Sequence, residues 1–172
     1  MTTQHPLNDN YCVFQAENAV WAVAAAAVRE IADAAPIVAV PEAPSEVVGV
    51  CHVRMEFLPV LSLPGLLGEA GADHHAPEFL LILNGGEGPW ALPIQKALSL
   101  QALEVAVGEM GSDGRFCSMG LLGTASFRDK VLRVIDASWL YRRAHEVIEN
   151  HWHRGVPSDA GRGPALSAAV PG

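Results

Sequence analysis

The histidines are the side chains of this sequence most suited to binding a metal ion. There are seven; His74 and His75 are adjacent, and His145, His151 and His153 lie near one another. A structural zinc site needs about four converging nitrogen or sulfur ligands. On a helix, His145 and His151 would face apart, because neighbours on one face are three or four residues apart. No HExxH or CxxC motif accompanies them. The sequence therefore predicts no metal site.

The three cysteines, Cys12, Cys51 and Cys117, are the candidate nucleophiles, but each lies within or beside an apolar segment. Thiols in such places usually act as small hydrophobic groups. His52 follows Cys51 directly, and strand alternation points the two side chains to opposite faces. Gly85–Gly88 is expected in a hairpin turn, without the helix N-terminus that a phosphate-binding loop needs. We therefore expect no enzyme and no cofactor; a small metal- or thiol-dependent enzyme is the alternative, which metal analysis would test.

Charge and hydrophobicity limit the partners of the chain. Lys and Arg total 11 and Asp and Glu total 19, giving a net charge of −8. A protein that binds nucleic acid or an anionic membrane surface needs a basic face, so the sequence disfavours both as partners. The uncharged run Asn18–Val28 is too short to span a membrane. The odd number of widely spaced cysteines indicates a reduced, cytoplasmic protein.

Short strands must position whatever site the chain carries. Pairs of apolar segments joined by polar or glycine-rich turns are typical of antiparallel hairpins. The sequence predicts four of them: Tyr11–Gln15 with Trp21–Val23, Val47–Val53 with Phe57–Leu63, Phe79–Leu83 with Trp90–Ile94, and Met119–Ala125 with Lys130–Asp136. Many short strands at close spacing favour small antiparallel barrels.

One helix is predicted near the end of the chain. Apolar side chains recur there on one helical face, at Leu140, Ala144, Val147, Ile148 and Trp152. Either Asp136 or Ser138 can cap its N-terminus, and Gly155 ends it. We expect one domain over residues 11–154, with a flexible N-terminus over residues 1–10 and a disordered tail over residues 155–172.

Several short motifs follow one another in a fixed order. They are Val28-Arg-Glu-Ile31, Pro41-Glu-Ala-Pro44, Gly49-Val-Cys-His-Val-Arg54, Phe57–Leu63, Gly120-Leu-Leu-Gly123 and Val131–Asp136. Together they resemble the CheW family of bacterial chemotaxis coupling proteins, whose pattern runs V-x-E-I, P-x-x-P, G-V-x-x-x-R-G and a strand with P-V or P-I. The resemblance covers about Tyr11–Ala144.

The resemblance implies a mainly β fold of two small SH3-like five-stranded β-barrel subdomains that share a core, here followed by a C-terminal helix. It also implies a non-catalytic scaffold that couples chemoreceptors, the methyl-accepting chemotaxis proteins, to the histidine kinase CheA. The expected partners are the cytoplasmic tip of the receptor, the regulatory domain of CheA and other CheW-like domains. The protein is then expected in the cytoplasm, recruited to receptor arrays at the membrane.

The resemblance also assigns positions to two interfaces. The receptor-binding residues it implies are Val28, Glu30, Ile31, Arg54, Phe79 and Leu80. The kinase-binding residues it implies are Val48 and Gly49. Glu30 and Arg54 can pair either with each other or with the receptor.

Three positions depart from the family pattern. Met55 stands where the family usually has a glycine after the arginine, Gln95 where an aspartate is frequent, and His52 where asparagine or threonine is common. The missing glycine predicts a differently shaped hairpin, because glycine serves tight turns. These departures support an alternative, a divergent CheW-like adaptor of a surface-motility or other two-component pathway.

Overall fold

The computed structural model describes residues 10–69, 76–107 and 120–154. The expected flexible N-terminus, apart from Asn10, and the expected tail over residues 155–172 lie outside the described residues. Asn10 is the first residue of a strand.

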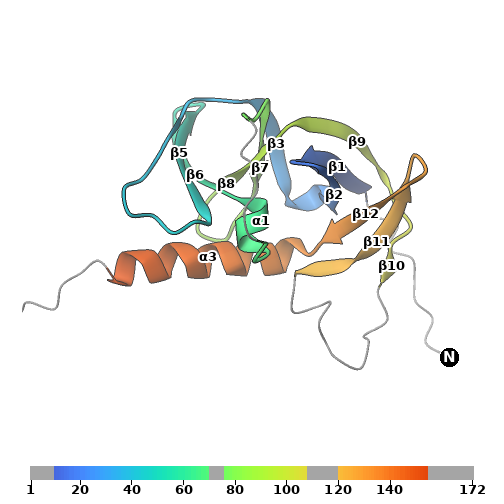
Figure 1. Ribbon diagram of the computed structural model, residues 1–172. Helices are drawn as coiled ribbons and strands as arrows, with labels where there is room; N and C mark the ends of the chain where they lie inside the picture. Colours follow the sequence, from blue (N-terminus) through green and yellow to red (C-terminus); the bar gives the residue numbers. More distant parts are fainter. Residues whose placement is uncertain (1–9, 70–75, 108–119, 155–172) are drawn as a thin grey trace, which may run out of the picture.

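The described residues fold into two six-stranded sheets and a C-terminal helix (Figure 1). The first sheet has the order β10 (Ala106–Val107), β11 (Leu121–Phe127), β12 (Lys130–Ile135), β2 (Ala19–Ala24), β1 (Asn10–Ala16) and β9 (Lys96–Ala102). The second has the order β3 (Val28–Asp33), β7 (Phe79–Leu83), β8 (Trp90–Ile94), β6 (Glu56–Leu61), β5 (Val47–Val53) and β4 (Ile37–Val38). The helices within these described ranges are η1 (Ala25–Ala27), α1 (Leu63–Leu66) and α3 (Ala137–Arg154).

The expected fold class, mainly β in two units with a C-terminal helix, is confirmed. All four predicted hairpins form, as β1–β2, β5–β6, β7–β8 and β11–β12. In each sheet one strand, β4 or β10, is only two residues long. Each sheet thus has six strands in the described residues, rather than the five expected in each subdomain, and one of the six is very short.

The chain passes from the first sheet to the second and then returns to the first. β1 and β2 open the first sheet, the chain then builds the second sheet from β3 to β8, and it returns to the first at β9. Parallel pairs complete the sheets, β12 with β2 and β6 with β8. Because the first sheet is built from both ends of the domain, the second cannot be cut from the chain without opening the first.

In the part of the chain that the structure describes, three hydrophobic clusters follow from strands that are apolar on both faces. Each sheet encloses a cluster of its own, one around Val13 and Leu132, the other around Leu58 and Leu80. A third, which we call the central cluster, joins both sheets and α3. Its members include, from the first sheet, Phe14, Trp21 and Ile135; from the second, Leu81, Leu92 and Ile94; and from α3, Leu140, Ala144 and Val147. The two sheets therefore share one core.

The helix α3 runs from the end of β12 along the base of the second sheet (Figure 1). Its N-cap is Asp136, whose Oδ1 accepts hydrogen bonds from the backbone N–H groups of Ser138, at 2.9 Å, and Trp139, at 3.2 Å. The Tyr141 hydroxyl accepts a hydrogen bond from the Glu87 backbone N–H at 2.9 Å. The helix thus joins β12 of the first sheet to the β7–β8 turn of the second.

Candidate functional site

Two of the predicted receptor-binding residues, Glu30 and Arg54, meet where β3 approaches the turn of the β5–β6 hairpin. The Arg54 Nη2 atom lies 3.0 Å from the Glu30 Oε2 atom. Beside this pair, the Arg29 Nη1 atom lies 2.8 Å from the Glu56 Oε2 atom. β3 stands at one end of the strand order and β5–β6 towards the other, so the second sheet must curl to bring them together.

A β-bulge in β3 allows two adjacent residues to reach the same hairpin. The register of β3 with β7 shifts between Val28 and Glu30, so Arg29 is the additional residue. Regular alternation would send Arg29 and Glu30 to opposite faces. A bulge suspends that alternation and re-aims side chains locally. Both residues form ion pairs with the same hairpin, Glu30 with the turn residue Arg54 and Arg29 with Glu56 at the start of β6.

The turn itself is a two-residue connection between Val53 and Glu56, which face each other in register. Its residues, Arg54 and Met55, have φ angles of 46° and 69°. Two consecutive positive φ values define the type I′ turn that suits a two-residue hairpin. The hairpin keeps a tight turn even though methionine replaces the glycine of the family pattern.

The six predicted receptor-binding residues differ in how far they reach the surface. The Arg54 side chain is 76% exposed, the Glu30 side chain 22% and Ile31 37%. Val28 and Phe79 are half-buried against the central cluster. Leu80 is completely buried in the cluster of the second sheet. The structure thus brings Glu30 and Arg54 into contact, places Val28, Phe79 and Leu80 in the hydrophobic packing of β3 and β7, and leaves Leu80 without an accessible side chain.

The predicted kinase-binding residues lie at the other end of β5. Val48 is half-buried and sits at a register shift between Val47 and Gly49. Gly49 is buried under β4: a Cβ atom there would lie 2.3 Å from the Val38 carbonyl oxygen. Val48 therefore offers a side chain near the surface, whereas Gly49 allows β4 to lie close to β5.

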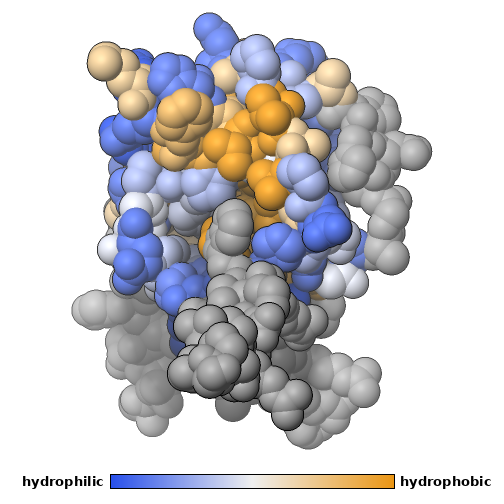
Figure 2. Space-filling view, turned by 90° about the vertical axis from the view of Figure 1, so that its left-hand side faces the viewer, coloured by the Kyte–Doolittle hydropathy of each residue, from blue (hydrophilic) through white to orange (hydrophobic). Residues whose placement is uncertain are grey.

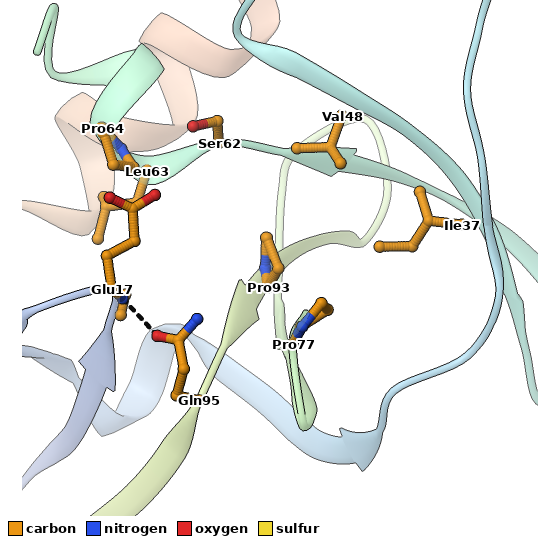
Figure 3. A pocket seen from close by; sticks show the side chains of 10 residues that line it. Glu17, Ile37, Val48, Ser62, Leu63, Pro64, Pro77, Pro93 and Gln95 are labelled. Atoms are coloured by element: carbon orange, nitrogen blue, oxygen red, sulfur yellow. Dashed lines mark hydrogen bonds between the residues drawn. The ribbon is translucent and has the colours of Figure 1, made fainter. Parts of the chain in front are cut away.

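A small pocket lies where the two sheets meet, and Val48 is one of its walls (Figure 3). The pocket is also lined by Ile37, Leu63 and Pro93, together with Glu17 and Gln95. The Glu17 backbone N–H donates a hydrogen bond to Gln95 Oε1. The volume is about 70 Å³, whereas small-molecule sites usually measure roughly 300–1,000 Å³. This pocket is too small for a cofactor, and Gln95 serves to hold the β1–β2 turn.

The outer face of the second sheet is apolar, a feature that the motifs did not reveal. Val38, Val50 and Pro59 are partners in register across β4, β5 and β6. Next to them His52 faces Phe57, with ring centroids 5.0 Å apart. Val38 is 70% exposed and Phe57 77% exposed. Figure 2, viewed from the side of β5 and β6, shows hydrophobic residues gathered on this face. The sequence did carry a signal for it: in β5 and β6, apolar residues occupy most positions of both alternating faces of the strand.

The titratable side chains of the described residues form no reactive centre. No group of three or more His, Cys, Asp or Glu side chains converges there as a metal site would require; His74 and His75 lie outside the described residues. Burial raises the pKa of the Cys12 and Cys51 thiols, which lowers the thiolate fraction on which nucleophilic attack depends. No described helix is long and apolar enough to cross a bilayer.

Comparisons with known proteins agree with this arrangement. The family model described as CheW-like domain matches residues 10–144, most of the chain. Among solved structures, the scaffolding protein TtCheW from Thermoanaerobacter tengcongensis superposes with a TM-score of 0.61 at 17% sequence identity, covering 78% of this chain and 88% of that one. A search of curated proteins found no match. With the matched region taking in both sheets and the start of α3, the chain belongs to the CheW family of non-catalytic scaffold proteins of chemotaxis signalling.

Proposed function

We propose that this chain is an adaptor that couples chemoreceptors to the histidine kinase CheA. One partner is the cytoplasmic tip of a receptor, a helical hairpin, and the other is the regulatory domain of CheA. The adaptor works in the cytoplasm, where receptor arrays recruit it to the membrane. Other CheW-like domains are further partners within such arrays.

The ion pair between Glu30 and Arg54 is the observation that carries the receptor assignment. It fixes Arg54 beside β3, yet 76% of that side chain stays exposed, so its remaining N–H donors are available to a partner. Ile31 supplies apolar surface on the same strand. A helix docks well where apolar contacts lie next to a few polar ones. Val28, Phe79 and Leu80 support this surface from β3 and β7.

The kinase-facing residues lie far enough away for both partners to bind at once. Val48 and Gly49 are the second and third residues of β5, and Arg54 follows its last residue. Seven residues of strand span about 20 Å. A coupling protein must hold two partners simultaneously, and this separation supports that role. Val48 provides the contact, while Gly49 keeps β4 in the position that shapes the contact surface.

A binding experiment with a charge exchange tests the receptor assignment. The double substitution Glu30→Arg with Arg54→Glu keeps an ion pair within the protein but reverses its polarity. Since exposed ion pairs contribute about 0–1 kcal/mol, the free energy of unfolding should change by no more than about 1 kcal/mol. Titration against the receptor tip encoded in the same genome should show at least a ten-fold loss from micromolar affinity. Titration against the CheA regulatory domain should remain unchanged.

Two further variants act as controls for this experiment. Lys130→Glu changes the charge of an exposed residue at the β11–β12 hairpin, in the other sheet, and should leave both affinities unchanged. Val48→Lys should weaken kinase binding and spare receptor binding. Folded wild-type protein that does not bind the receptor tip, or does not bind the CheA regulatory domain, would overturn the proposal. In that case an adaptor role in a different two-component pathway would be the next hypothesis to test.

A further inference from the structure

Met55 combines two unfavourable features in one side chain. It is the most exposed of the large apolar residues in the described part of the chain, at 90%. Its φ angle of 69° lies in the left-handed region, which glycine, asparagine and aspartate adopt more readily than methionine. Neither exposure nor backbone geometry explains methionine at this position, because a glycine would relieve the strain and remove the exposed apolar surface.

The β11–β12 hairpin shows the same turn with an ordinary residue in place of the methionine. In the β11–β12 hairpin, Arg128 and Asp129 have φ angles of 46° and 61°, nearly the values of Arg54 and Met55. Each turn is thus an arginine followed by a second residue in the left-handed region, between paired flanking residues. Aspartate tolerates this conformation, because its short polar side chain can hydrogen-bond locally. The fold therefore makes no demand for an apolar residue at position 55.

The neighbours of Met55 suggest what the side chain contacts. It stands between Arg54 and Glu56, and both charges are held in ion pairs with β3. Methionine is flexible and polarizable, and it adapts to the shape of an apolar partner. We propose that Met55 is a specificity-determining residue of the receptor-binding site, which adds an apolar contact immediately beside Arg54. This inference rests on the proposed function and extends it to a residue at which the chain departs from its family.

The chemistry of the turn defines the partner that it selects. Arg54 binds a carboxylate best, and Met55 packs best against an apolar side chain next to that carboxylate. Side chains three or four residues apart on a helix are neighbours on one face. The occupant is therefore a receptor helix that carries Asp or Glu and, one turn away on the same face, a Leu, Ile, Met or Phe. A receptor tip with a polar residue at that second position should be discriminated against.

Three variants separate contact from turn geometry in one experiment. Met55→Gly removes the side chain and restores the family residue, Met55→Leu keeps an apolar side chain, and Asp129→Gly makes the equivalent backbone change in the matched hairpin. We expect Met55→Gly to reduce affinity for the receptor tip of the same genome about five- to ten-fold, from the loss of buried apolar area. Its Tm should not fall below that of the wild type, and its affinity for the CheA regulatory domain should not change.

The remaining outcomes decide the inference. Met55→Leu should bind the receptor tip within about two-fold of the wild type, and Asp129→Gly should bind it as the wild type does. If the wild type binds and Met55→Gly binds equally well, Met55 is no contact and the inference fails while the proposed function stands. If Asp129→Gly weakens binding as much as Met55→Gly, the effect comes from turn flexibility, and the inference again fails. If the wild type does not bind the receptor tip, both proposals are overturned.

Discussion

Gly49 determines how closely β4 can approach β5. A Cβ atom at this position would meet the Val38 carbonyl oxygen at 2.3 Å and the Ile37 Cγ2 atom at 2.8 Å. One of these contacts is with backbone, which cannot rotate out of the way as a side chain can. Ile37 and Val48 line the pocket between the sheets, so any displacement of β4 changes the surface beside Val48. A glycine in the family motif thus has a packing role in this chain.

The Gly49→Ala substitution should therefore lower the free energy of unfolding by about 2–3 kcal/mol, as expected for overpacking against a rigid neighbour. Urea denaturation followed by circular dichroism measures this loss. Gly68→Ala is the control: Gly68 has a φ angle of 74°, but a Cβ atom there would meet nothing within 4 Å. It should lose only about 1 kcal/mol, from the left-handed backbone. Equal losses in the two variants would contradict the clash with β4.

The elements of the chain were largely predictable, because hairpins and helix ends are encoded locally. The β5–β6 and β7–β8 hairpins each have apolar segments on either side of a short turn, and the structure confirms them. Parallel pairing of β12 with β2 could not be predicted in this way, since its partners are distant in sequence. The two-residue strand β4 was too short to give a pattern.

The candidate site was predictable in its members but not in its geometry. Motif order placed Glu30 and Arg54 in one site and left open whether they pair, and the structure shows a 3.0 Å ion pair. The pair between Arg29 and Glu56 was not foreseen, because strict alternation sends Arg29 away from Glu30. The register shift within β3 falls at Arg29, where it interrupts the regular alternation. A bulge depends on the neighbouring strand, so it leaves little trace in the sequence.

The N-cap of α3 gives a test at the scale of one element. The sequence allowed either Asp136 or Ser138 as the cap, and the structure selects Asp136, which accepts two backbone hydrogen bonds. Asp136→Ala leaves those N–H groups without their side-chain acceptor and should lower the free energy of unfolding by about 1 kcal/mol. Ser138→Ala should change it by less than about 0.5 kcal/mol, because Ser138 is exposed. A larger loss from Ser138→Ala than from Asp136→Ala would show that the cap is assigned wrongly. Thermal denaturation distinguishes the two variants.

At the scale of the whole molecule, the path of the chain predicts that the two sheets unfold together. The first sheet is built from both ends of the domain, and the central cluster takes side chains from both sheets and α3. Loss of one sheet would expose the apolar side chains that the other packs against it. The proposed adaptor role also requires that the sheets stay together, because the two proposed interfaces then keep a fixed relative position.

The two buried cysteines can test directly whether the two sheets unfold together. Cys12 belongs to the central cluster and Cys51 to the cluster of the second sheet, and burial raises both thiol pKa values. In the folded protein both thiols should therefore react slowly with a thiol reagent, since the thiolate is the reactive form. In a Cys117→Ser background, labelling in increasing urea, read for each cysteine by mass spectrometry, should give one midpoint for both. This midpoint should coincide with the loss of circular dichroism, as two-state unfolding requires. Labelling of Cys51 at clearly lower urea would show that the second sheet opens alone, and that the shared core does not couple the two sheets.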